Sequence, residues 1–132
     1  MSRTHAENGE RVSENWDAVF RCLSAEPRRQ LVVSLLGAPS DESVPLPESA
    51  AMPDRSSHPD VLHRALHHVH LPMLAEHGFV TWDAEPLTAA RGPRFDEVAV
   101  VFEALHSVSI PDSLVVGCRR LEAERQDSAN RS

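Results

Sequence analysis

Apolar positions in the first part of the chain recur at helical spacing. From about Ser13 onward they fall at i, i+3, i+4 and i+7. This pattern predicts one helix with a single buried stripe, formed by Trp16, Val19, Phe20 and Leu23.

A second helix is expected directly after the first. Ser24 has the side chain of an N-cap, Pro27 falls in the first turn, and Gly37 is a typical stop. Arg28 and Arg29 are expected on the early, outward side of this helix. The side chains predicted to face the core are Leu31, Val32, Leu35 and Leu36. Prolines in residues 38–58 allow only a short helix around 46–52.

Residues 59–77 predict the longest helix. Ser57, Pro59 and Asp60 supply a cap, an early proline and an acid in the first turn. Pro72 removes one backbone hydrogen bond, so a kink or break is expected there, and Gly78 ends the helix. The stripe expected to face the core contains Leu62, Ala65, Leu66, Val69 and Met73.

Two short apolar runs, 79–83 and 87–90, follow the long helix and predict a hairpin. A last helix is expected over about 95–107, and 110–116 is a short apolar tail. The predicted inner face of this last helix contains Val98, Val101, Phe102 and Leu105. This order predicts a mainly α fold with a small β-hairpin wing, the winged helix-turn-helix, with a recognition helix at about 59–77 and a wing at about 79–90.

Length and composition narrow the class of protein. The 132 residues suffice for one domain, expected at 13–117 between disordered segments 1–12 and 118–132. The polar N-terminus resembles no signal peptide and no run is long enough to span a membrane, so we expect a cytoplasmic protein. Cys22 and Cys118 have no metal-site or disulfide-framework spacing.

The chain is acidic, and the type of its basic residues is unusual. The net charge is −7, and all 13 basic residues are arginine. A lysine-free acidic chain suggests a high-GC genome and a high-salt organism, or high-GC codon bias alone. Negative charge disfavours DNA binding, but at molar salt only contacts at short range matter.

Three segments resemble a known family. Residues 66–83, LHHVHLPMLAEHGFVTWD, contain the His-His-x-His-Leu-Pro signature, the glycine and the aromatic-Asp pair of an ArsR-like winged-helix family of halophilic archaea. Residues 23–31, LSAEPRRQL, resemble its opening motif, and residues 91–97 resemble a segment that follows the wing. The resemblance covers about 16–105 and implies a cytoplasmic transcription regulator that binds double-stranded DNA. The proline-interrupted segment 44–56 departs from the family pattern.

Candidate DNA contacts follow from helical geometry. At about 100° per residue, His63, Arg64, His67, His68 and His70 are expected off the inward stripe of the long helix. The first four of these are candidate DNA contacts. Further cations flank this helix or anchor the earlier one, and these are Arg55, Arg91, Arg94, Arg28 and Arg29.

Three other functions compete with DNA binding. His63, His67 and His70 fall at i, i+4 and i+7, a zinc-compatible spacing, but no cysteine or fourth ligand is evident, so we expect no metal or other cofactor. Phosphate loops and nucleophile motifs are missing, which argues against an enzyme. The strongest alternative is a winged-helix interaction module that forms a homodimer through its last helix and 110–116 without binding DNA.

Overall fold

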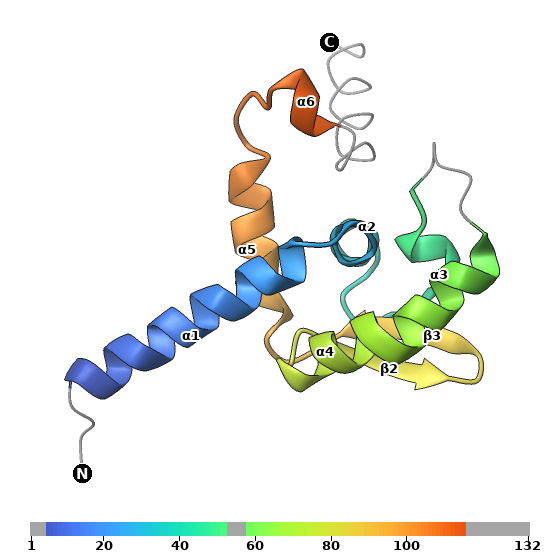
Figure 1. Ribbon diagram of the computed structural model, residues 1–132, viewed down its shortest axis with the longest axis horizontal. Coiled ribbons are helices and arrows are strands. Elements are labelled where there is room, and N and C mark those ends of the chain that lie inside the picture. The colour runs from blue at the N-terminus through green and yellow to red at the C-terminus, as the bar shows by residue number, and fades with distance from the viewer. Residues whose placement is uncertain (1–4, 53–57, 116–132) are drawn as a thin grey trace.

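The computed structural model describes residues 5–52 and 58–115 (Figure 1). Its helices are α1 (His5–Leu23), α2 (Glu26–Leu36), α3 (Pro59–Ala65), α4 (Leu71–Glu76), α5 (Phe95–Leu105) and α6 (Asp112–Val115). A 3-10 turn, η1 (Glu48–Ala50), and a π turn, η2 (Leu66–His70), complete the helical part. The strands are β1 (Val44–Pro45), β2 (Val80–Ala84) and β3 (Leu87–Arg91). The chain is therefore mainly helical with a small sheet, as the sequence predicted. Within the described residues, no helix is long and apolar enough to cross a membrane.

The sheet is antiparallel, in the order β1-β3-β2. Ala84 pairs with Leu87, so Glu85 and Pro86 form the turn of the predicted hairpin. Strand β1 was not predicted, because two residues that include a proline give no alternating pattern. Pro45 is tolerated there since β1 lies at an edge of the sheet.

Helix α2 lies at the centre of the molecule, seen end-on in Figure 1. Leu31, Val32 and Leu35 are buried, as predicted, and Leu36 is half-buried. Two predictions for this helix were wrong. Its N-cap is Ala25 and not Ser24, whose hydroxyl donates to the Arg21 carbonyl at 2.7 Å. Arg28 is buried instead of outward, because it reaches back to the end of α1.

Helix α1 begins at His5, earlier than the expected start near Ser13, and its first half extends away from the other helices (Figure 1). Ala18, Val19 and Cys22 are buried. The predicted stripe was wrong at Trp16 and Phe20, which are 48% and 56% exposed. The helix packs on α2 and α5 through the side that carries Ala18 and Cys22, so the two aromatic rings stack on each other outside the core.

The long helix is continuous from 59 to 76 but changes its hydrogen bonding midway. The Leu71 amide donates to the Leu66 carbonyl, one residue further back than in an α-helix. This π turn lies directly before Pro72, where the sequence predicted a disturbance. The extra residue rotates the inner face, so Leu71 and Leu74 are buried and Val69 is 57% exposed. The prediction that Val69 faces the core was therefore wrong.

The last elements agree with the predictions in part. Val98 and Phe102 of α5 are buried and Val101 is half-buried. Leu105 is 53% exposed, against prediction, although Phe102 and His106 at the same end of α5 are buried. Of the predicted short helix at 46–52, only the 3-10 turn η1 forms. The boundaries of the predicted domain stay a prediction, and the segment 118–132 lies outside the described residues.

Candidate nucleic-acid interface

The outward side of α3 and η2 carries three exposed side chains that can donate hydrogen bonds, His63, Arg64 and His68. They lie beside the β2–β3 turn, where helix and hairpin enclose a cavity of about 430 Å³. The residues lining this cavity are Asp60, His63, Arg64, His67, His68, Ala84 and Glu85. One guanidinium and three imidazoles therefore face solvent or this cavity at one edge of the molecule.

His67 holds this row of side chains against the hairpin. Its ring meets the Trp82 ring of β2 edge-on, with centroids 5.4 Å apart. It also stacks with His63 at 6.5 Å and contacts His68 edge-on at 4.7 Å. Its Nδ1 is buried, and no described side chain or backbone group forms a hydrogen bond with it. His67 thus contributes more to positioning than to a solvent-facing contact.

Arg28 and Arg29 bond to the end of α1. Arg28 donates from Nε to the Cys22 carbonyl at 3.1 Å and from Nη2 to the Arg21 carbonyl at 2.8 Å. Arg29 donates to the Leu23 carbonyl at 2.8 Å. The last carbonyls of a helix lack intrahelical partners and carry partial negative charge, so arginine is a suitable cap. The guanidinium groups of both arginines therefore already have hydrogen-bond partners within the chain.

Arg28 also reaches the long helix. Its Nη1 lies 2.8 Å from Nδ1 of His70. Burial first, and then the Arg28 charge, lower the pKa of His70, and burial is also the main cause that lowers the pKa of Arg28. Burial raises the pKa of the neighbouring Cys22 thiol to about 12, so this thiol is neutral and gives Arg28 no counter-charge.

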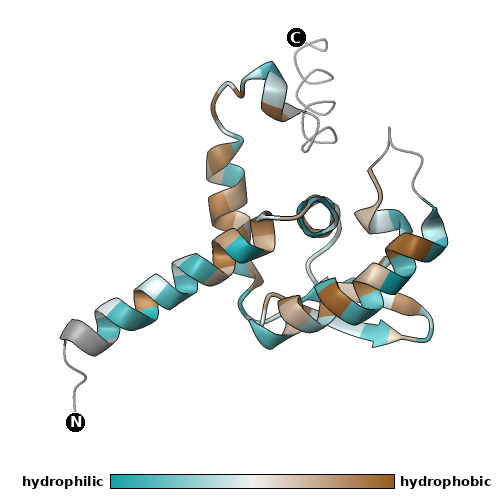
Figure 2. Cartoon of the chain, viewed as in Figure 1, coloured by the Kyte–Doolittle hydropathy of each residue, from teal (hydrophilic) through white to brown (hydrophobic). Residues whose placement is uncertain are grey.

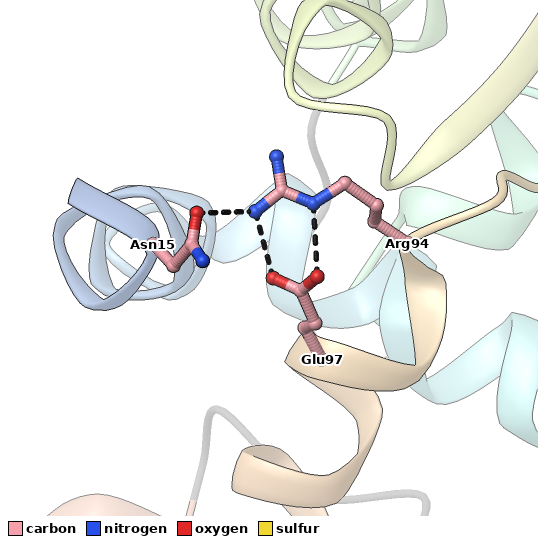
Figure 3. Close-up of polar contacts among 3 residues, drawn as sticks. All are labelled: Asn15, Arg94 and Glu97. Carbon is pink, nitrogen blue, oxygen red and sulfur yellow. Dashed lines mark hydrogen bonds and ion pairs between the residues drawn. The ribbon is translucent and has the colours of Figure 1, made fainter. Parts of the chain in front are cut away.

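Arg91 and Arg94, at the exit of the hairpin, also have partners within the chain. Arg91 donates to the Leu35 carbonyl at 2.9 Å and lies over the Phe95 ring at 5.0 Å. Arg94 forms a two-point ion pair with Glu97, at 2.8 and 2.9 Å, and donates to Asn15 of α1 at 2.7 Å (Figure 3). The hydrogen bond to Arg94 lowers the pKa of Glu97. The i,i+3 spacing of Arg94 and Glu97 is a local signal for their ion pair, whereas the sequence has no signal for the bonds to Leu35 and Asn15, which lie far away along the chain.

The structure thus divides the predicted contacts into two groups. The exposed group contains His63, Arg64 and His68, with His67 behind them. The second group, which is bonded internally, contains Arg28, Arg29, Arg91 and Arg94. Arg55 lies outside the described residues. Two acidic residues that the sequence reasoning left out, Asp60 and Glu85, line the same cavity and limit its positive charge.

The three histidines with zinc-compatible spacing do not point to one place. The rings of His63 and His67 stack on the hairpin side, whereas His70 faces Arg28 on the opposite, inner side. The prediction that His70 lies off the inward stripe was therefore wrong. The π turn causes this separation, because it adds a residue to the turn before His70. Across residues 5–52 and 58–115, no three histidine, cysteine or acidic side chains form a group suited to a metal ion.

Comparison with known proteins identifies no relative. No family model, curated protein or solved structure matches this chain. The resemblance to ArsR-like winged-helix regulators therefore stays a prediction, and functional inference has to rest on the exposed row at 63–68 and on the surface of α1 and α5.

Proposed function

We propose that this protein binds double-stranded DNA as a winged-helix protein, with the helix at 59–76 as its recognition helix. The observation that carries the proposal is the exposed row of His63, Arg64 and His68 beside the hairpin turn. Arginine and neutral or charged imidazole can donate to base edges and phosphate oxygens. This row lies in the first half of the helix, the half that winged and related helix-turn-helix proteins present to DNA.

The element order supports the winged-helix part of the proposal. The hairpin β2–β3 directly follows the long helix, and β1 extends it to three strands. Gly78, with φ of +78°, allows the abrupt turn from helix to hairpin. The hairpin would then serve as the wing, with Glu85 and Pro86 at its tip.

The charged side chains near the exposed row favour DNA binding that uses only a few phosphate contacts. Four of the predicted arginines bond to groups within the chain, and Asp60 and Glu85 flank the exposed row. Each phosphate neutralised adds about −0.9 to the slope of log affinity against log salt. We therefore expect a shallow salt dependence of DNA binding.

A binding titration tests this proposal. Fluorescence anisotropy with labelled DNA from upstream of the protein's own gene should show saturable binding at low and at molar potassium chloride. An unrelated fragment of equal length serves as the control. Absence of saturable binding to either fragment at every salt concentration would reject DNA binding.

We infer that the functional form is a homodimer joined through the α1–α5 surface, defined by Val12, Trp16, Phe20 and Val100. These side chains are 48–63% exposed. Helices α1 and α5 form a hollow of about 290 Å³ beside Trp16, and Figure 2 shows apolar colour along α5 next to α1. A twofold axis would let the same surface on two copies bury itself. The same dimer without DNA binding is the alternative function.

A further inference from the structure

We propose that the hydrogen bond between Arg28 and His70 is a proton-sensitive latch that fixes the long helix on α1 and α2. Neutral His70 closes the latch, and protonation of its ring opens it. The part of this inference that concerns DNA affinity rests on the proposed function, whereas the latch itself can be measured without DNA.

The chemistry of the two groups sets the direction of the hydrogen bond. A guanidinium has five N–H donors and no acceptor, and it stays protonated in proteins. Nδ1 of His70, 2.8 Å from Nη1 of Arg28, must therefore present its lone pair. An imidazolium has hydrogens on both nitrogens, so a protonated His70 would direct an N–H and a positive charge at Arg28. The contact can exist only with neutral His70.

Arg28 cannot easily move away from a protonated His70. Its other donors bond to the Cys22 and Arg21 carbonyls and to the Ser24 hydroxyl. Arg28 is also 9% exposed, so its alternatives to these partners are few. When His70 is protonated, its repulsion from Arg28 is therefore relieved by movement of His70 and of the helix that carries it.

The other charged groups near this point do not cancel the Arg28 charge. The Cys22 thiol is neutral, Arg29 bonds to the Leu23 carbonyl, and Arg21 and Glu76 are exposed. Glu26 of α2 lines a cavity beside Val61 and Ala65, at the α3 end of the long helix. His67 faces Trp82 on the hairpin side. Both effects on the pKa of His70, burial and the Arg28 charge, act in the same direction and lower it.

The π turn gives the latch its mechanical role. His70 is the last residue of η2, and the extra residue in that turn is what rotates its ring toward α2. An opened latch removes a contact that holds this turn against α2. The helix that carries the exposed row at 63–68 would then lose part of its fixed orientation.

The sign of the pH dependence follows from the lowered pKa. Below the ordinary histidine pKa of 6.5, the open state takes up a proton that the closed state excludes. Above pH 6.5 the preference for the closed state is therefore at its maximum. As the pH falls below this value, the ratio of open to closed state grows by up to about tenfold per pH unit.

Two measurements on the full chain without DNA test the latch. Ring-nitrogen NMR should show Nδ1 of His70 unprotonated at pH 8 and a titration midpoint of His70 below the ordinary histidine value of 6.5. Amide protection factors over 66–76, corrected for intrinsic exchange, should fall as the pH drops from 8 to 5. In the variant His70→Asn the amide oxygen can accept from Arg28 and cannot be protonated, so this fall should disappear. His68→Asn, in the same turn but exposed, should keep it.

DNA affinity supplies the second readout. As the pH falls, affinity of the His70→Asn variant should exceed that of the wild type by a ratio that grows from about one at pH 8. A proton on Nδ1 at pH 8, or an equal loss of protection in wild type and His70→Asn, overturns the latch. If neither protein binds DNA at any pH, the proposed function fails, and the NMR and exchange results still decide on the latch.

Discussion

Three arginine side chains in the described part of the chain cap the C-terminal ends of helices. Arg28 and Arg29 donate to the last carbonyls of α1, and Arg91 donates to the Leu35 carbonyl at the end of α2. A guanidinium suits this task because its five donors reach several carbonyls at once. Counting arginines in the sequence therefore overstates the positive charge available to a nucleic acid.

Arg94 is the clearest test of this structural role. It joins α1 to α5 through Asn15 and Glu97, and it lies 5.8 Å over the Phe79 ring (Figure 3). The ion pair is more than a third exposed, so solvent reduces its contribution. We expect Arg94→Ala to lower the free energy of unfolding by about 1 kcal/mol, measured by urea denaturation. DNA affinity should not change, and a tenfold loss of affinity with unchanged stability would make Arg94 a DNA contact.

Gly92 is required by a close approach of two backbones. A Cβ at this position would lie 2.5 Å from the Gly78 carbonyl oxygen and 2.8 Å from the Val80 amide nitrogen. Both are backbone atoms that cannot turn aside, so we expect Gly92→Ala to destabilise the protein by about 1–3 kcal/mol. Thermal denaturation followed by circular dichroism measures this. Gly9→Ala is the matched control, since a Cβ there meets nothing within 4 Å, and equal effects of the two substitutions would contradict the packing described.

At the scale of elements, the π turn explains where sequence reasoning failed. Regular 3.6-residue spacing places Val69 with Leu66 on the inner face, and this spacing holds only up to η2. Pro72 indicated a disturbance, but the sequence could not tell a kink from an added residue. Most other elements were predictable, because their glycines, prolines and apolar spacing are local signals, whereas the short strand β1 depends on its partner β3. The predicted caps were wrong, since α2 begins after Ala25 and α3 after His58.

Paired substitutions in the long helix test this register. Val69→Ser should change the free energy of unfolding by less than about 0.5 kcal/mol, as is usual at exposed positions. Leu71→Ala, which empties a fully buried site, should cost about 2–5 kcal/mol. Urea denaturation at neutral pH gives both values. A larger cost for Val69→Ser than for Leu71→Ala would show that the helix is regular through residues 66–70.

At the scale of the whole molecule, the exposed aromatic pair on α1 is the main departure from the predicted core. A sequence stripe shows that a helix has an apolar side, and it cannot show whether the same chain or another copy covers that side. Trp16 and Phe20 stack together at 5.7 Å on a helix whose first half extends away from the other helices. This arrangement supports the α1–α5 surface as a dimer interface.

Sedimentation velocity tests the interface. We expect the wild type to sediment as a dimer and Trp16→Glu to sediment as a folded monomer, because the variant places a charge in the apolar contact. Val61→Glu is the control, since Val61 is also an exposed apolar residue, at 58% against 48% for Trp16, but lies on α3. A monomeric wild type, or a Trp16→Glu variant that remains dimeric, would contradict the proposed interface.

The most direct test of the account is the DNA affinity of Arg64→Glu. Arg64 is the exposed arginine of the row at 63–68, and Arg11→Glu on α1 matches it in charge change and exposure. In anisotropy titrations with DNA from upstream of the gene, Arg64→Glu should weaken binding at least about tenfold, since a lost arginine contact costs about 1–3 kcal/mol. Arg11→Glu should bind like the wild type. Unchanged affinity of folded Arg64→Glu would contradict the assignment of this helix as the DNA-contacting element.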